Sequence, residues 1–276
     1  MTDTAMTDTS PVLFDRRDGI ARVTLNRPAK MNALTPEMVV RLAAFWEEVA
    51  DDDSIRVVLV TGAGEKAFCS GGDLGTLIPI MMRTREPADE WEEKLAARRS
   101  LLYAALLRND TFFKPVVAAV NGLALAGGAE FLLSTDIRVA STTARFALTE
   151  VRRGLIAGGG SLVRLARQLS WADAMEVALV GEPIDAAHAL RIGLVNRVVE
   201  PAQVLPVAED LARRICLGAP VALARSKEAM VRSNGRPLAE AFAIEAECTV
   251  ANARTEDARE GPRAFMEKRD PVFHGR

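Results

Sequence analysis

The chain is poor in the residues on which several common classes of protein depend. It has three cysteines and two histidines among 276 residues. An odd number of cysteines without the spacing of metal ligands argues against a disulfide framework, and it fits a reducing compartment. We therefore expect the protein to be cytoplasmic and to lack a structural metal.

The scarcity of histidine also limits the chemistry that the chain can perform. A Ser-His-Asp or Cys-His arrangement would need His188 or His274, and neither lies in a recognisable motif. The sequence contains no HExxH, paired CxxC or GxxxxGK[ST] motif, and the segment Gly62-Ala63-Gly64 lacks the third glycine of a dinucleotide fingerprint. Zinc and P-loop chemistry are therefore without support.

Neither charge nor hydropathy indicates a nucleic-acid or membrane partner. Thirty-five basic residues nearly cancel 37 acidic ones, for a net charge of −2. No apolar run approaches the roughly 18 to 20 residues that cross a bilayer. The polar start, MTDTAMTDTS, lacks the basic and apolar parts of a secretory signal. We predict a disordered leader over residues 1–10, with Met6 as a second candidate start.

The pattern of apolar residues predicts an α/β core over residues 11–200. Residues 12–26 alternate on both sides of Asp18-Gly19, which is typical of a hairpin. Thr35 and Pro36 suit the N-cap and first position of a helix. Apolar runs at 57–60, 116–120 and 137–140 predict buried strands, and their alternation with helices indicates a parallel sheet with right-handed crossovers. Further helices are expected at 126–134, 162–169, 172–180 and 185–192, and a last strand at 195–199.

The strand pattern ends near residue 200. Helices are predicted at 202–216, 220–232, 237–254 and 256–268. These helices are too few to enclose a core of their own, so we expect them to pack on the main domain and on partner subunits. Residues 201–276 are therefore predicted to be a helical oligomerisation region.

Two glycine-rich turns, AFCSGGDL at 67–74 and NGLALAGGAE at 121–130, each follow an apolar run. Each could bring bare backbone amides to a helix start, where two N–H groups can hold one oxyanion. Glu130 lies three residues after Gly127, on the same face of the helix. A single turn of this kind could equally serve close packing, and Glu130 alone could complement the helix dipole. The repetition of the design favours carbonyl chemistry.

Seven blocks in order make the sequence resemble the crotonase superfamily, that is, the enoyl-CoA hydratase/isomerase family, over residues 12–276. The resemblance implies a spiral of ββα units, a C-terminal helical trimerisation region and commonly a hexamer built from two trimers. It implies an acyl thioester of coenzyme A as the substrate, so coenzyme A is not a separate cofactor. The blocks are NRPAKMNAL (26–34), KAFCSGGDL (66–74), KPVVAAVNGLALAGGAE (114–130), TDIRVA (135–140), ARFALTEVRRGLIAGGG (144–160), GLVNRVV (193–199) and EGPRAFMEKRDPVF (260–273).

The resemblance also implies roles for particular residues. It places the oxyanion hole on the backbone amides of Ser70 and Gly127, although family members often have alanine where Ser70 stands. The two hydratase glutamates match Glu130 and Glu150. We assign Glu130 to water activation and Glu150 to proton delivery at C2, although coupled acids can share a proton. This chemistry needs no metal or redox cofactor.

Substrate contacts follow from the same blocks. Lys30 and the backbone of Ala33 resemble the family's coenzyme A contacts, and Lys66 lies beside the oxyanion loop, although both lysines could simply be solvated. Phe265 and Lys268 resemble tail residues that reach the coenzyme A of a neighbouring subunit. The glycine-rich turns add further candidate binding residues, namely Ala67, Gly71, Asp73, Leu74 and Gly128.

The segment from 73 to 115 is longer than in short-chain members of the family and is rich in methionine. A flexible apolar surface suits a medium, long or bulky acyl group, such as a sterol side chain. The alternative is that these residues pack against the core or a neighbouring subunit. The residues in question are Leu77, Ile78, Ile80, Met81, Met82 and Trp91.

Three functions remain open. Paired glutamates favour a hydratase of lipid metabolism, or the reverse dehydration as in a carnitinyl-CoA-type dehydratase. A double-bond isomerase is the nearest rival, because one glutamate is enough to shuttle a proton. A non-catalytic scaffold that binds coenzyme A or RNA is disfavoured by the neutral charge and the intact pair of acids.

Overall fold

The computed structural model describes residues 9–108 and 111–276. The predicted leader therefore falls almost entirely outside the described residues. Ser10 lies against the start of the first strand, where its carbonyl accepts a hydrogen bond from the Asn26 side chain at 2.9 Å. None of the helices in these two ranges is long and apolar enough to cross a membrane.

The chain begins with the hairpin that the sequence predicts. Strands β1 (Val12–Arg17) and β2 (Ile20–Leu25) pair antiparallel. Asp18 and Gly19 both have positive φ, at 53° and 78°, as a two-residue turn of this twist requires. The turn sequence therefore fixes the register of the pair, in which Arg17 faces Ile20.

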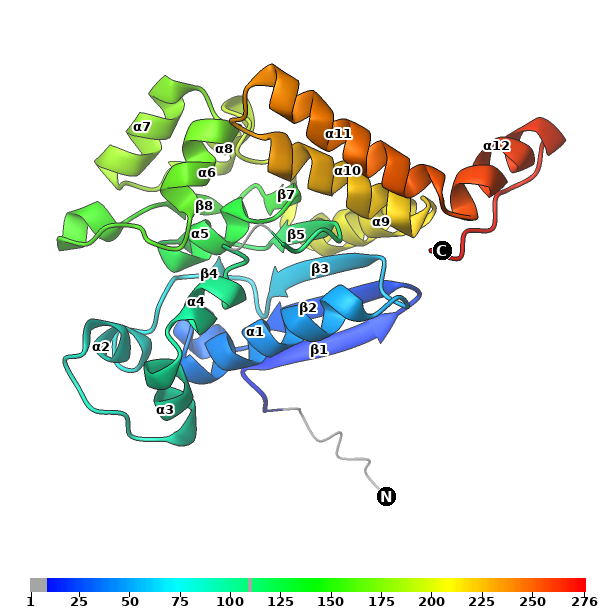
Figure 1. The fold of residues 1–276 in the computed structure, drawn as a ribbon. Coiled ribbons are helices and arrows are strands. Elements are labelled where there is room, and N and C mark those ends of the chain that lie inside the picture. Colours follow the sequence, from blue (N-terminus) through cyan, green and yellow to red (C-terminus); the bar gives the residue numbers. More distant parts are fainter. Residues whose placement is uncertain (1–8, 109–110) are drawn as a thin grey trace.

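A six-stranded sheet extends from the hairpin in the order β1-β2-β3-β5-β7-β10, and every pair except β1–β2 is parallel (Figure 1). The apolar runs form its centre, as expected, while the last strand is shorter than predicted. These strands are β3 (Val57–Gly62), β5 (Val116–Val120), β7 (Ile137–Ser141) and β10 (Arg197–Val199).

A second sheet of four short strands was not predicted from the apolar pattern, because two or three residues are too few to show alternation. Its strands are β4 (Ala67–Cys69), β6 (Leu123–Leu125), β8 (Arg145–Ala147) and β9 (Ile184–Asp185), in that spatial order. The chain passes from β3 to β4, from β5 to β6 and from β7 to β8. Each turn therefore contributes one strand to each sheet before a helical segment follows, which confirms the expected spiral of ββα units.

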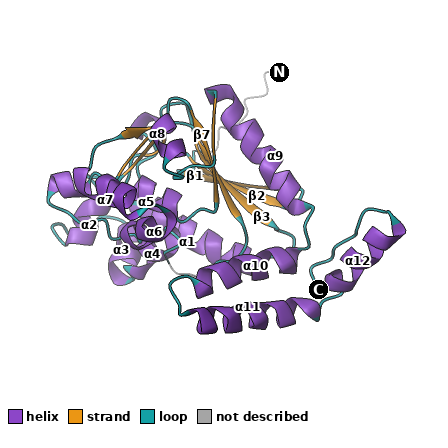
Figure 2. Cartoon of the chain, turned by 90° about the horizontal axis from the view of Figure 1, so that it is seen from above, coloured by secondary structure: helices purple, strands orange, loops and turns teal. Residues whose placement is uncertain are grey.

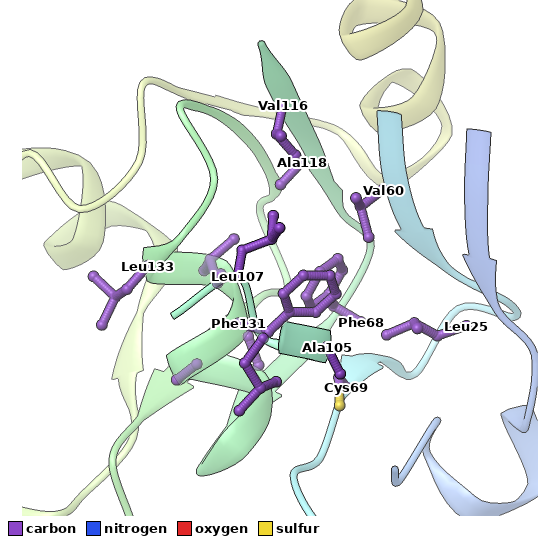
Figure 3. Close-up of a cluster of buried hydrophobic side chains, with 14 of the residues drawn as sticks. Leu25, Val60, Phe68, Cys69, Ala105, Leu107, Val116, Ala118, Phe131 and Leu133 are labelled. Atoms are coloured by element: carbon purple, nitrogen blue, oxygen red, sulfur yellow. The ribbon is translucent and has the colours of Figure 1, made fainter. Parts of the chain in front are cut away.

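Helices cover both sheets, and the main hydrophobic core lies beneath α1 (Pro36–Asp51), whose N-cap Thr35 accepts from the Met38 amide at 3.3 Å. Trp46 of this helix packs edge-on against Phe131. Phe131 also lies next to Phe68 (Figure 3). The remaining helices of this part of the chain are α2 (Leu77–Met82), α3 (Glu90–Ala97), α4 (Ser100–Ala105), α5 (Gly127–Leu133), α6 (Ser161–Gln168), α7 (Trp171–Val180) and α8 (Ala186–Arg191), with short 3-10 helices η1 (Pro28–Lys30) and η2 (Glu150–Arg153).

The C-terminal region is helical, as predicted. After the short helix η3 (Pro201–Gln203), α9 (Val204–Cys216) covers the outer face of the six-stranded sheet and so belongs to the packing of the main domain (Figure 2). Helices α10 (Pro220–Ser233) and α11 (Leu238–Ala253) lie side by side, and Arg232 joins them by binding Glu228 and Glu247. Helix α12 (Asp257–Glu267) extends beyond this pair (Figure 1).

Gly128 holds α5 against the end of β4, and we predict that Gly128→Ala is strongly destabilising. A β-carbon at this position would lie 2.1 Å from the Cys69 carbonyl oxygen. Alanine normally favours a helix by up to about 1 kcal/mol over glycine, but here it would meet backbone. We expect the free energy of unfolding to fall by about 3 kcal/mol in urea denaturation.

Gly158→Ala is the matched control, since the nearest atom to its added β-carbon would be 4.0 Å away. Its stability should stay within about 0.5 kcal/mol of the wild type. Equal stability of the two variants would show that the close approach at Gly128 does not hold α5 in place.

Candidate active site

The glycine turn after β4 leaves one backbone amide free to face the start of α5. The Gly71 carbonyl accepts from the Leu34 amide at 2.8 Å. In a trans peptide the C=O and N–H groups point in opposite directions, so the Gly72 N–H points away from Leu34. Among the described residues this N–H has no backbone acceptor.

The start of α5 leaves a second amide free. The Ala126 carbonyl accepts from the Glu130 amide at 3.0 Å along the helix. The Gly127 N–H, in the same peptide as that carbonyl, therefore points out of the N-terminus of the helix. A β-carbon on Gly127 would lie 3.6 Å from the Gly72 nitrogen, so the two free amides are close neighbours.

The expectation that Ser70 supplies one oxyanion donor does not fit the structure. The Ser70 amide donates to the Met31 carbonyl at 3.1 Å and is already engaged within the protein. The free amide lies two residues further along, at Gly72. The sequence block could not distinguish these neighbours, because the direction of each N–H depends on how the turn pairs with residues 31–34.

Glu130 is 6% exposed and lies one turn into α5. Its Oε1 accepts two hydrogen bonds, from the Gly159 amide at 2.6 Å and from the Ser161 hydroxyl at 2.8 Å. Burial raises the pKa of this carboxyl, while the hydrogen bonds from Ser161 and Gly159 oppose the rise. One oxygen is thus fixed in place, and Oε2 remains available to a reactant.

Glu150 opens the 3-10 helix η2. Its Oε2 is buried and has no hydrogen-bond partner among the residues that the structure describes. Burial raises the pKa of Glu150 to about 7, and the nearby negative charge of Glu130 adds to the rise. At neutral pH this carboxyl is therefore able to hold a proton and to release it.

Among the residues predicted to contact coenzyme A, the lysine side chains are free to bind a ligand, whereas the alanine backbones already have partners within the protein. The side chains of Lys30 and Lys66 are exposed and free to meet a phosphate. The Ala33 backbone is already engaged, because its amide donates to the Lys30 carbonyl and its carbonyl accepts from Arg27 at 2.6 Å. The Ala67 carbonyl likewise accepts from Asn32 at 2.7 Å. These two backbone positions shape the loops in this structure.

Other candidates from the glycine turns also have internal partners. Asp73 binds Arg27 at 3.0 Å and accepts from the Gly75 amide at 2.9 Å, so it stabilises the turn. Gly71 has a φ of 99°, which a side chain would strain, and Gly128 provides the close contact described above. Leu74 is 70% exposed and remains available to a ligand.

Phe265 and Lys268 lie at the end of α12, and Phe265 is 82% exposed. Figure 1 shows α12 projecting at the edge of the molecule, far from α5. Within one chain these residues therefore do not reach the glutamates, and any contact with substrate would require a neighbouring subunit.

Three of the six residues expected to line an acyl pocket pack within the protein, whereas Met82 is 55% exposed. Leu77 and Ile80 are each 2% exposed and belong to the core. Trp91 is covered by Lys94, whose nitrogen lies 4.5 Å from the ring centroid. Ile78 and Leu77 both approach the first free amide, since Ile78 Cδ1 and Leu77 Cδ2 would lie 2.9 Å and 3.3 Å from a β-carbon on Gly72.

Sequence reasoning did not find three contributors to this site, namely Gly72, Gly159 and Ser161. Gly72 stands beside the expected residue in the same block. The segment 158–161, GGGS, leads into α6, and its contact with Glu130 joins residues about 30 positions apart. Only the tertiary packing of α5 and α6 reveals that contact.

Two free amides at the start of α5, the buried carboxyl of Glu130 and the nearby carboxyl of Glu150 indicate a class of protein: an α/β enzyme that polarises a carbonyl and moves a proton next to it. The model of the family described as enoyl-CoA hydratase/isomerase matches residues 15–276. The chain is 39% identical over 265 residues to the (E)-benzylidenesuccinyl-CoA hydratase of Thauera aromatica, covering 96% of this chain and 99% of that one.

Two further proteins agree in sequence and in fold. An enoyl-CoA hydratase of Mycobacterium tuberculosis is 38% identical, covering 96% of both chains. The crystal structure of an enoyl-CoA hydratase from Mycobacterium marinum superposes with a TM-score of 0.85 at 36% identity, covering 97% of this chain and 100% of that one. The chain belongs to the enoyl-CoA hydratase/isomerase family of the crotonase superfamily.

Ser161→Ala tests how Glu130 is positioned. Losing one donor should raise the pKa of Glu130, so the acidic limb of the kcat/KM profile for enoyl-CoA hydration should move to higher pH. Because this hydrogen bond is made to a charged group, its loss should lower kcat/KM roughly 10- to 100-fold. Glu150 and Arg108 also act on Glu130 and are unchanged in this variant.

Ser161→Thr keeps the hydroxyl and should retain most of the wild-type rate and profile. A wild-type pH profile in Ser161→Ala would show that this hydroxyl does not hold the base.

Proposed function

We propose that Gly72, Gly127, Glu130 and Glu150 together catalyse the addition of water to a 2-enoyl-CoA thioester and its reversal. Hydration of enoyl-CoA is the activity that the family and the relatives support for this chain. The residues that perform it, and their separate roles, are inferred from the geometry of the site.

The two free amides are placed to polarise the thioester oxygen. When water adds at C3, negative charge develops on that oxygen, and fixed N–H donors stabilise it without reorganising. Loss of one such donor typically costs roughly 100- to 1,000-fold in rate. Because the donors belong to the backbone at Gly72 and Gly127, no side chain is needed for this step.

The two glutamates divide the proton transfers. Glu130 is held through Oε1 by Gly159 and Ser161, so its Oε2 takes the proton of the attacking water. The neutral form of Glu150 then delivers a proton to C2, and the enolate collapses to the saturated 3-hydroxyacyl thioester. Transfer of the proton from Glu130 back to Glu150, within the coupled pair or through water, restores the starting state. In the reverse direction each group performs the opposite transfer. None of these steps requires a metal or redox cofactor.

One observation carries this proposal: the Oε2 of Glu150 is buried, has no hydrogen-bond partner among residues 9–108 and 111–276, and belongs to a carboxyl whose pKa is near neutrality beside a second acid. A carboxyl that served only the fold would be paired with a donor, as Asp73 is with Arg27. The arrangement fits an acid that exchanges its proton with a reactant.

Glutamine substitutions separate hydration from isomerisation. Glu130→Gln should lower kcat/KM for hydration of crotonyl-CoA by about 100-fold or more, because the base is lost. An isomerase that used Glu150 alone would keep much of its rate on a 3-enoyl-CoA in the same variant. Loss of the absorbance of the enoyl thioester measures hydration.

The matched control is Glu176→Gln, which changes an exposed glutamate of α7. Its hydration rate should equal that of the wild type. Full hydration by Glu130→Gln would overturn the assignment of the base.

The pH dependence follows from the pKa of Glu150. Hydration needs this carboxyl protonated, so kcat/KM should fall as the pH rises through about 7. Ionised Glu130 is needed as well, so activity should also fall at acidic pH, and the two limbs belong to the coupled pair. A profile that stays flat from about pH 6 to 9 would contradict an acid role for Glu150.

We further propose a cytoplasmic trimer, or a hexamer of two trimers, in which α12 of one subunit reaches the coenzyme A of the next. Exposed apolar side chains on α10 and α11 support an assembly, since Met230, Leu238 and Phe242 are 75%, 74% and 63% exposed. Phe265 and Lys268 would then meet substrate across the subunit boundary.

A further inference from the structure

Residues 78–106 form one continuous segment that begins beside the proposed oxyanion hole and ends beside the proposed base; we call this segment the acyl wall. At its start, Ile78 lies against Gly72. At its end, a β-carbon on Gly159 would lie 2.7 Å from Leu106 Cδ1 and 2.9 Å from Glu130 Oε2. An acyl group with its carbonyl at Gly72 and its C3 at Glu130 would therefore extend toward the residues that follow α4.

Arg108 lies two residues after Leu106, at the outer end of the acyl wall. Its side chain is exposed, and its Cγ would lie 3.2 Å from a β-carbon on Gly160, next to the loop that holds Glu130. Its guanidinium carbon lies 4.2 Å from the ring centroid of Tyr103, the single tyrosine of the chain. This cation–π contact holds the guanidinium over the ring, and the exposed side chain keeps N–H groups accessible.

The guanidinium of Arg108 makes no hydrogen bond or ion pair with residues 9–108 or 111–276. Arg164, which meets Gly160 beside Arg108, is engaged, because it donates to the Leu107 carbonyl at 2.6 Å. Arg153, an exposed residue beside Glu150, donates to the Thr149 carbonyl at 3.1 Å. Arg108 is thus a stacked cation with unused donors at the outer end of the acyl wall.

We propose that Arg108, held over Tyr103, binds a second carboxylate at the far end of the acyl group. The preferred substrate class is then the CoA monothioester of an unsaturated dicarboxylic acid. This inference rests on the proposed function and specifies its substrate. Guanidinium edges bind carboxylates through two parallel hydrogen bonds, and the positive charge offsets repulsion from Glu130 and Glu150.

The sequence-derived expectation of a wholly apolar acyl site differs from this inference. Leu77 and Ile80 are buried in the core and Trp91 is covered, so these three are not available to an acyl chain, whereas Met82 is 55% exposed. The outer end of the wall carries a cation. An apolar chain of equal length would leave that cation without a partner.

The test compares two six-carbon substrates, trans-2-hexenoyl-CoA and the monothioester trans-2-hexenedioyl-CoA, which share the double bond and differ in the terminal carboxylate. The wild type should hydrate the dicarboxylic substrate with the higher kcat/KM. Arg108→Gln should reduce the ratio of the two kcat/KM values by about tenfold or more, chiefly through KM. Arg108→Lys, which keeps the charge but not the planar fork, should lose part of the ratio.

Three further variants act as controls. Arg213→Gln changes an exposed arginine on α9, on the outer face of the six-stranded sheet, and should leave the ratio unchanged. Tyr103→Phe keeps the aromatic ring and should keep the ratio, whereas Tyr103→Leu should lower it. Equal ratios in the wild type and Arg108→Gln, or a wild-type preference for hexenoyl-CoA, would overturn the proposal.

The substrate pair also separates the two levels of inference. Hydration of neither substrate by the wild type would overturn the proposed function itself. Hydration of hexenoyl-CoA with discrimination against the dicarboxylic substrate would leave that function intact and remove the role of Arg108. A fall of both kcat/KM values by the same factor in Arg108→Gln would also remove it, because the cation would then act on Glu130 alone.

Discussion

The contact between Gly128 and the Cys69 carbonyl is the constraint on which the site depends. No side chain can stand between these backbones, since a β-carbon would lie 2.1 Å from the oxygen. The first turn of α5 therefore rests on the end of β4, and the loop that follows β4 must pass the N-terminus of the helix. This contact brings the Gly72 and Gly127 amides together, and both are donors because their peptide carbonyls are bonded in the opposite direction.

The proton transfers of the proposed mechanism depend on two carboxyls that lie near each other and are partly removed from water. Each acid loses hydration, and the charge on either one raises the cost of ionising the other. The two carboxyls are solvated unequally by the protein: Glu130 receives two hydrogen bonds on one oxygen, whereas Glu150 has a buried oxygen that accepts no hydrogen bond from the part of the chain that the structure describes. Unequal solvation of two similar groups is what separates a base from an acid in the proposed mechanism.

Much of the fold could be predicted from the sequence, because its strongest signals are local. Asp18-Gly19 specifies a turn, Thr35-Pro36 a helix start, and the continuous apolar runs a buried parallel sheet. The short strands of the second sheet carry no such signal, since Leu123–Leu125 is too short to show a period. They exist because neighbouring turns of the spiral supply their hydrogen-bond partners.

The residues of the site likewise fall into two groups: some can be recognised from the local sequence, and others only from tertiary contacts. Gly127, Glu130 and Glu150 fall within recognisable blocks, whereas the choice between Ser70 and Gly72 depends on which peptide pairs with residues 31–34. Ser161 and Arg108 are invisible to a motif, because their relevance comes from contacts made by α6 and by the end of α4. A net charge of −2 likewise gave no indication of a local cation beside the two acids.

The spiral itself explains why two similar loops meet. Strands β3 and β5 are parallel neighbours in one sheet, and the strands that follow them, β4 and β6, are parallel neighbours in the other. Parallel neighbours end at the same edge of a sheet, so the loops after β4 and β6 must emerge side by side. Repeating one ββα unit therefore brings two glycine-rich turns to a single point. The paired donors follow from that repetition, and the acids need only lie on the elements that come next in the chain.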